Sequence, residues 1–97
     1  MKIIWSEPAI VDIENIKNYI SQDSEWYAVI FIEKIIAAVE KLVHFPRIGH
    51  IVPETNNKDI REILYQHYRI IYKIEKAAIF MLTVVHGGRD LSGWFNK

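Results

Sequence analysis

Residues 60–86 contain three runs rich in β-branched and aromatic residues, separated by two very short gaps. The runs are Ile60–Tyr65, Tyr68–Ile74 and Ala78–His86, and the gaps are Gln66-His67 and Glu75-Lys76-Ala77. This composition is typical of β-strands, and gaps of two or three residues can join only antiparallel neighbours. The sequence therefore predicts a three-stranded antiparallel meander, which limits the chain to folds built around such a sheet.

The chain up to residue 22 predicts a short strand followed by a helix. Lys2–Trp5 is short and apolar, and Ser6 is placed to cap a helix whose first turn holds Glu7-Pro8, both favoured there. The apolar residues of this helix recur at helical spacing and form one stripe: Ala9, Ile13, Ile16 and Ile20. We expect the helix to end at Ser21-Gln22.

A second helix is predicted to begin after Asp23 or Ser24 and to run to about His44. Phe45-Pro46 ends it, because the residue before a proline is pushed out of helical space. Two helices joined by so short a turn form an antiparallel hairpin. Residues 46–59 then form a connector of uncommon length for a small domain, and long connectors often carry function.

The order of these elements predicts an α+β fold of two layers. An N-terminal strand is followed by an antiparallel helical hairpin, which packs on an antiparallel β-sheet. With 97 residues, half of them apolar, residues 1–97 are expected to form one domain, near the small end of what buries its own core.

The register of the meander decides which side chains share a face. If Ile74 pairs with Ile79, then Arg69 lies opposite Val84. The cationic side chains that this register places on the open face are Arg69, Lys73 and His86. The more uniformly apolar face, expected against the helices, holds Tyr68, Ile70, Tyr72, Ile74, Ile79, Met81 and Val85.

The first turn of the meander leaves two registers open. A two-residue turn at Gln66-His67 places Glu62 on the face of Arg69 and Arg61 on the opposite face, whereas a three-residue turn reverses this. Arg61 is in one case a site residue and in the other part of an ordinary exposed strand. Arg69 itself has a purely structural alternative, a pair with Glu62 or Glu75 across the sheet.

Composition excludes several kinds of chemistry. The chain has no cysteine, so disulfides, thiolate nucleophiles and sulfur-rich metal sites are excluded. The histidines are scattered among loops and strand ends, so we expect no metal site and no cofactor. No apolar run approaches the roughly 20 residues that span a bilayer, so no membrane association is expected and a cytoplasmic location is the default.

Charge is unevenly distributed although the formal net charge is zero. Residues 1–57 hold five Lys/Arg against eight Asp/Glu, and residues 58–97 hold seven against four. The sheet half is therefore the basic half, although an excess of three is small for a surface that follows phosphates.

Taken in order, the motifs of this chain resemble those of the RelE/ParE superfamily of toxins from type II toxin-antitoxin modules. The matching motifs are Trp5-Ser6-x-x-Ala9-x-x-Asp12-Ile13-x-x-Ile16-x-x-Tyr19-Ile20, Pro46-x-x-Gly49, Ile60-Arg61-Glu62, Tyr68-Arg69-Ile70-Ile71-Tyr72 and Val85-His86-Gly87-x-Arg89-Asp90. They cover essentially the whole chain. The fold that the resemblance implies, a helical hairpin against an antiparallel sheet, agrees with the fold predicted from periodicity.

The resemblance implies a growth-arresting toxin that a cognate antitoxin neutralises in a hetero-oligomeric complex. The antitoxin's disordered segment is expected to fold along exposed surfaces of the toxin. Trp94 and Phe95, on a short tail, are candidates for an apolar patch that the antitoxin covers. The superfamily splits by target, because RelE-like and YoeB-like members cut messenger RNA on the ribosome and ParE-like members inhibit DNA gyrase.

The nuclease alternative assigns candidate roles to four residues. Arg69 and Arg89 match arginines of the family and would bind phosphate, and Glu54 lies roughly where YoeB-like members keep a catalytic glutamate. His86 carries an imidazole, the side chain most often used for proton transfer near neutral pH. Cleavage of RNA through its own 2'-hydroxyl needs such a base and such cations. Arg61 and Lys73 are candidates for binding the target or RNA.

Departures from the nuclease pattern favour the ParE-like branch. Where RelE-like enzymes have lysines on the strand before the arginine strand, this chain aligns Ile60 and Glu62. Where they have a tyrosine near the C-terminus, it has about Phe95, which cannot move a proton. Gyrase inhibition is therefore the preferred reading, with the ribosome-dependent nuclease as the alternative and an inactive interaction module as a third.

Overall fold

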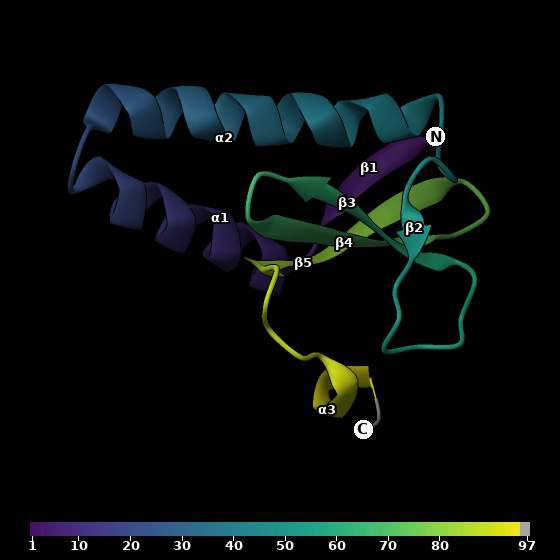
Figure 1. The fold of residues 1–97 in the computed structure, drawn as a ribbon. Helices are drawn as coiled ribbons and strands as arrows, with labels where there is room; N and C mark the ends of the chain where they lie inside the picture. Colours follow the sequence, from purple (N-terminus) through teal and green to yellow (C-terminus); the bar gives the residue numbers. More distant parts are fainter. Residues whose placement is uncertain (96–97) are drawn as a thin grey trace.

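The predicted helices and strands all form, and a short strand and a short C-terminal helix are added to them (Figure 1). The second helix, predicted to run to about His44, ends at Glu40 and continues as a 3₁₀ turn. The computed structural model describes residues 1–95. The elements in chain order are β1 (Lys2–Trp5), α1 (Glu7–Ser21), α2 (Glu25–Glu40), the 3₁₀ turn η1 (Lys41–Val43), β2 (His50–Ile51), β3 (Ile60–Tyr65), β4 (Tyr68–Ile74), β5 (Ala78–His86) and α3 (Ser92–Phe95). The strand order is β1-β5-β4-β3-β2. β1 pairs in parallel with β5, and the other neighbours are antiparallel.

The α+β class and the helical hairpin are thus confirmed, and serine caps begin both long helices. The Ser6 hydroxyl accepts a hydrogen bond from the Ala9 N–H at 3.2 Å, and that of Ser24 accepts one from Tyr27 at 3.1 Å. Of the two predicted caps for the second helix, Ser24 is therefore the one used. Among residues 1–95, no helix is both long enough and apolar enough to cross a bilayer.

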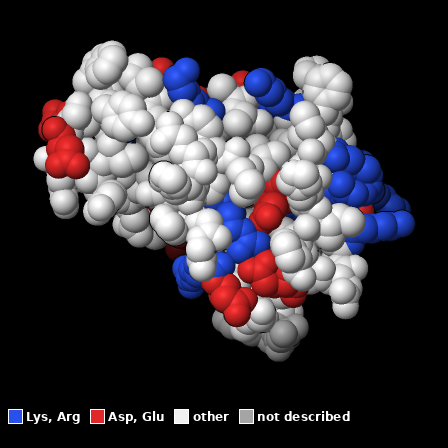
Figure 2. Space-filling view, viewed as in Figure 1, with Lys and Arg blue, Asp and Glu red and all other residues white. Residues whose placement is uncertain are grey.

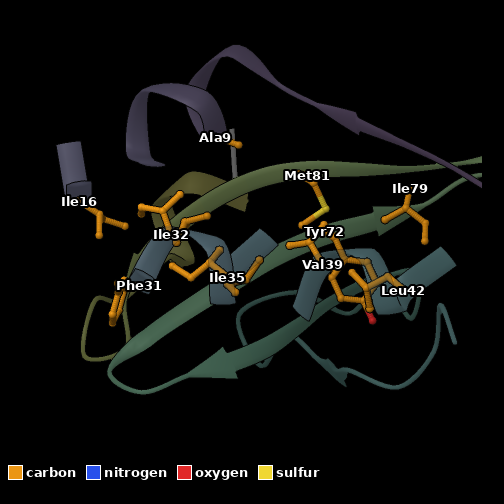
Figure 3. Packing of buried hydrophobic residues seen from close by; sticks show 12 residues of the cluster. Ala9, Ile16, Phe31, Ile32, Ile35, Val39, Leu42, Tyr72, Ile79 and Met81 are labelled. Atoms are coloured by element: carbon orange, nitrogen blue, oxygen red, sulfur yellow. The ribbon is translucent and has the colours of Figure 1, made fainter. Parts of the chain in front are cut away.

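The main core lies between the helical hairpin and one face of the sheet (Figure 3). Its buried members are Ala9, Ile16, Phe31, Ile32, Ile35, Val39, Leu42, Ile70, Tyr72, Ile79, Met81 and Val84. The Phe31 ring packs edge-on against Tyr65 and Tyr68, with centroids 5.2 and 5.7 Å apart. Full burial of an aliphatic or aromatic side chain contributes about 1.5–3 kcal/mol, so this cluster supplies most of the driving force for folding.

The opposite face of the sheet, predicted to be open, carries a second and smaller core. Its buried members are Val52, Ile71, Val85 and Leu91, and Ile60, Leu82 and Phe95 pack against them. Val52 comes from the connector and Leu91 from the C-terminal tail, so both segments fold back over this face. The prediction of an open face was wrong because neither segment shows the periodicity that would place it on the sheet.

The predicted pairing of Ile74 with Ile79 is confirmed, but the register shifts farther along the hairpin. A bulge at Leu82 sets Ile71 opposite Thr83 and Tyr72 opposite Met81. Arg69 therefore pairs with Val85 rather than with the predicted Val84.

The bulge also exchanges the faces of the residues that follow it in β5, and Val84 enters the main core. Val85 joins the second core instead of facing the helices, and His86 lies opposite Tyr68 instead of beside Arg69. One extra residue in a strand has this effect because side chains alternate with a period of two.

The turn between β3 and β4 contains two residues, as one of the two predicted registers requires. Tyr65 pairs with Tyr68, and Gln66 takes the left-handed conformation with φ 50°. Glu62 is consequently on the face of Arg69, and Arg61 is on the other.

Two side chains of the N-terminal region satisfy the polar groups at the bulge. The Asp12 carboxylate accepts hydrogen bonds from the Thr83 hydroxyl at 2.5 Å and from the Val84 N–H at 2.9 Å. The Ser6 hydroxyl donates to the Leu82 carbonyl at 3.0 Å. A bulge leaves backbone N–H and C=O groups without a partner on the neighbouring strand. These contacts supply the missing hydrogen bonds and also fix α1 to β5.

A buried tyrosine holds the start of the connector against the sheet. The Tyr72 hydroxyl donates to the Pro46 carbonyl at 2.7 Å and accepts from the Gly49 N–H at 3.1 Å. A Cβ at residue 49 would lie 2.5 Å from the Glu62 carbonyl oxygen and 2.6 Å from the tyrosine hydroxyl. The Pro46-x-x-Gly49 motif is therefore explained by close backbone approach, which only glycine permits here.

We expect Asp12→Ala to lower the free energy of unfolding by about 1–3 kcal/mol, because it leaves the buried Val84 N–H without an acceptor. Glu14→Ala, at an exposed position of the same helix, is the matched control and should change stability by less than about 0.5 kcal/mol. Urea unfolding followed by circular dichroism measures both. Equal midpoints for the two variants would contradict the role assigned to Asp12.

Candidate functional site

An open hollow of about 680 Å³ lies at the end of the sheet where β3 turns into β4 and β5 ends. Charged groups of both signs lie side by side at the middle of the molecule, close to α3 (Figure 2). The candidate catalytic residues that line the hollow are Glu54, Arg69, His86 and Arg89. The fold therefore brings all four together, from the connector, β4, the end of β5 and the tail.

Arg69 is not available to a ligand in this arrangement. Its side chain is only 7% exposed, and four of its five N–H donors are in use. Nε donates a hydrogen bond to the Glu62 carboxylate at 2.6 Å. Nη1 and Nη2 donate to the two carboxylate oxygens of Glu54 at 2.8 and 2.7 Å. Nη1 also donates to the Arg89 main-chain carbonyl at 3.0 Å. The expectation that Arg69 lies on an open face was therefore wrong. Phosphate binding by Arg69 stays a prediction.

Two carboxylates face a single guanidinium in this network, so its formal charge is minus one. The cross-strand pair of Arg69 with Glu62, one of the structural alternatives, is confirmed, whereas Glu75 pairs with Lys73. Glu62 belongs to the site although it was not among the candidate site residues. The partner that sequence reasoning missed is Glu54, because a loop residue fifteen positions from Arg69 in the chain carries no register signal.

Glu54 is held as a carboxylate rather than as a proton-transfer group. The hydrogen bonds from the Arg69 guanidinium lower its pKa from 4.5 to about 2, and a hydrogen bond from the Leu91 N–H at 3.0 Å contributes further. The same contacts raise the pKa of Arg69. A carboxylate with so low a pKa is a weak general base near neutral pH.

His86, His67 and Arg89 form the exposed part of the hollow. The His86 ring lies edge-on to Tyr68, with centroids 6.0 Å apart, and is stacked with His67 at 6.3 Å. Its Nδ1 accepts a long hydrogen bond, 3.4 Å, from the Gly88 N–H. The Arg89 side chain is exposed although its carbonyl is bound by Arg69. Of the four candidates, only His86 and Arg89 can therefore reach a partner directly.

The structure puts Arg61 and Lys73 at the opposite end of the sheet from the hollow. Arg61 donates from Nη1 to the carbonyl of Gly49 and from Nε to that of Lys58, both at 3.0 Å. Lys73 pairs with Glu75 at 3.2 Å on the surface. Neither lines the hollow, so these two predicted target-binding residues do not share a site with Arg69.

The two tail aromatics have different surroundings. Trp94 is 37% exposed, whereas Phe95 is half-buried and packs on the second core. Their rings contact edge-on, with centroids 4.9 Å apart. Of these two side chains, Trp94 is therefore the more exposed apolar group, and its contact with an antitoxin stays a prediction. Within residues 1–95, no three His, Cys, Asp or Glu side chains are arranged to hold a metal ion.

We expect Arg69→Met to destabilise the protein by about 3–5 kcal/mol, because it leaves Glu54 and Glu62 as uncompensated carboxylates with little exposure. Adding Glu54→Gln and Glu62→Gln to Arg69→Met removes both charges and should recover a large part of the loss. Chemical denaturation of the single and triple variants tests this coupling. A triple variant no more stable than Arg69→Met alone would contradict it.

Acid should weaken the same network within a defined range. Because folding lowers the pKa of Glu54 to about 2, the stabilisation it provides is complete above about pH 4.5 and is lost as the pH falls toward 2. The free energy of unfolding of Glu54→Gln should therefore depend less on pH in this interval than that of the unchanged protein. The exposed control Glu14→Gln should keep the original slope, and identical slopes for all three would refute the assignment.

Comparisons with known proteins agree with this fold. The family model described as the ParE toxin of type II toxin-antitoxin system, parDE, matches residues 3–91. A solved structure titled "Chromosomal ParDE TA system from P. aeruginosa" is similar with a TM-score of 0.74 and 17% sequence identity, over 89% of this chain and 95% of that chain. At this identity the likeness shows the fold alone. No match is found among curated proteins.

The family model covers nearly the whole chain, and its match agrees with the superfamily motifs, from Trp5-Ser6 to Arg89-Asp90. The protein therefore belongs to the ParE toxin family of type II toxin-antitoxin systems, within the RelE/ParE superfamily.

Proposed function

We propose that this protein arrests growth by binding to DNA gyrase, in the manner of ParE-like toxins, and that it does not cut messenger RNA. A cognate antitoxin keeps it inactive in a toxin-antitoxin complex. The observation that carries the proposal is the saturation of Arg69, since a nuclease needs that arginine to face the phosphate on which charge develops.

The electrostatics of the hollow also support binding without catalysis. A phosphate group that approached Arg69 would have to displace Glu54 and Glu62, the carboxylates already bound to it. Both like-charge repulsion and the loss of short ion pairs oppose that exchange. No lysine of β3 offsets them, since β3 reads Ile60-Arg61-Glu62-Ile63-Leu64-Tyr65.

The site also lacks suitable groups for proton transfer at the positions of Glu54 and Phe95. Glu54 has a pKa of about 2, so it remains ionised and weakly basic. About where RelE-like enzymes have a C-terminal tyrosine, this chain has Phe95, which cannot transfer a proton. The exposed His86 and Arg89 are the groups that favour the nuclease alternative, since both are accessible at the hollow.

The antitoxin has an apolar surface to cover on the helical hairpin. A groove between α1 and α2, beside β1, is lined by the apolar residues Trp5, Ile10, Ile13, Ile32 and Ile36 and by the charged residues Glu14 and Lys17. Ile10 is 45% exposed and Ile36 38% exposed, which leaves apolar area uncovered in the isolated chain. An amphipathic helix laid in this groove is the expected mode of neutralisation.

The deciding experiment measures both activities of one purified sample. We expect the protein to inhibit supercoiling of relaxed plasmid by purified gyrase and to leave messenger RNA intact in a reconstituted translation reaction read by primer extension. The protein encoded by the neighbouring reading frame, tested as antitoxin, should reverse the inhibition when it is added in excess.

Controls use His86→Ala and Arg89→Ala, because their side chains are exposed, whereas any Arg69 variant confounds activity with folding. Cuts at the ribosomal A site that vanish in these variants, with supercoiling unaffected, would establish the nuclease instead. Absence of both activities in a folded sample would favour an inactive interaction module.

A further inference from the structure

Lysines and arginines gather at the end of the sheet opposite the hollow, where β1, β3 and β5 begin and β4 ends (Figure 2). This surface, here named the basic end, consists of Lys2, Arg47, Lys58, Arg61, Lys73 and Lys76. Two carboxylates pair with it, Asp59 with Arg47 at 2.9 Å and Glu75 with Lys73 at 3.2 Å. Six cations against two paired carboxylates leave the surface strongly positive in a chain whose formal net charge is zero.

Arg61 is held rigidly at the centre of the basic end without being neutralised. Main-chain carbonyls of Arg47, Gly49 and Lys58 accept its hydrogen bonds, at 3.3, 3.0 and 3.0 Å. Carbonyls orient a guanidinium but do not cancel its charge. Among residues 1–95 no carboxylate pairs with Arg61, so its fixed planar fork is pre-organised for an anionic group.

Exposed apolar side chains adjoin these cations. Phe45 is 62% exposed and Ile48 61% exposed, and with Pro46 and Arg47 they line a shallow hollow. A surface that follows the phosphates of a nucleic acid is polar and densely cationic, and it does not need two large apolar groups beside its arginines. A protein segment that carries both carboxylates and apolar side chains matches the two kinds of surface at once.

We propose that the basic end is a docking surface for an acidic, amphipathic segment of the antitoxin, a proposal that rests on the proposed function for that partner. Carboxylates of the segment lie against Lys58 and Arg61, and an apolar side chain lies between Phe45 and Ile48. α2 runs from the apolar groove near Ile36 toward Phe45, so one antitoxin chain that fills the groove continues onto the basic end.

The test measures binding of the neighbouring-frame antitoxin to the full-length toxin by titration calorimetry at 50 and 300 mM salt. Lys58→Glu and Lys76→Glu, at exposed positions with no ion pair among residues 1–95, should each raise the Kd about three- to tenfold at low salt and much less at high salt. The matched control Lys34→Glu makes the same change in net charge on the exposed surface of α2 and should leave the Kd unchanged.

The contribution of the exposed apolar side chains is tested with a second variant and its own control. Phe45→Ser should raise the Kd about tenfold, whereas Leu64→Ser, at a position 63% exposed near the far end of the sheet, should have little effect. Unchanged binding by the variants of the basic end, while the original toxin binds the antitoxin, would overturn the inference and leave the proposed function standing.

Two further outcomes distinguish the remaining explanations. If the original toxin does not bind this antitoxin at all, both the inference and the partner named in the proposed function fail. If Lys58→Glu and Lys76→Glu instead abolish binding of a labelled 20-base-pair duplex and leave antitoxin binding intact, the basic end is a nucleic-acid surface and the inference is wrong.

Discussion

The guanidinium of Arg69 joins four separate parts of this chain, and the second face of the sheet depends on it. Its hydrogen bonds reach the connector at Glu54, β3 at Glu62 and the tail at the Arg89 carbonyl, while its own strand lies at the centre of the sheet. The small core around Leu91 lies where the tail and the connector meet over the sheet, and these are the two segments that Arg69 joins. A catalytic-looking arginine thus acts here as the structural centre of a site.

The helical face depends on a different kind of contact, made at the bulge of β5. Asp12 and Ser6 satisfy polar groups that the irregular strand leaves unpaired, and this fixes the position of α1 on the sheet. The bulge in turn decides that Val85 enters the second core and that His86 lies beside Tyr68. The presence of His86 in the hollow therefore follows from the bulge in β5, which Asp12 of α1 stabilises.

The sequence was sufficient to predict the helices, the meander and the fold class, because these rest on local periodicity, capping and short turns. The strand register alone placed Arg69, Lys73 and His86 together, and the family resemblance was needed to add Glu54 and Arg89 as candidates. It could not predict that Arg69 is buried, because burial there arises from a loop and a tail that carry no periodic pattern. The bulge was equally hard to predict, since β5 is apolar from Ala78 to Val85 except for Thr83 and contains no glycine or proline that would mark an irregularity.

The tail is attached to this network through its main chain. Arg69 holds the carbonyl of Arg89, Glu54 holds the N–H of Leu91, and the Gly87 N–H bonds to the His67 carbonyl at 2.6 Å. None of these three bonds uses a side chain of the tail. The exposed side chain of Arg89 is therefore free to diverge without loosening the scaffold, so the chemistry that the hollow presents can change on a segment whose path is set elsewhere.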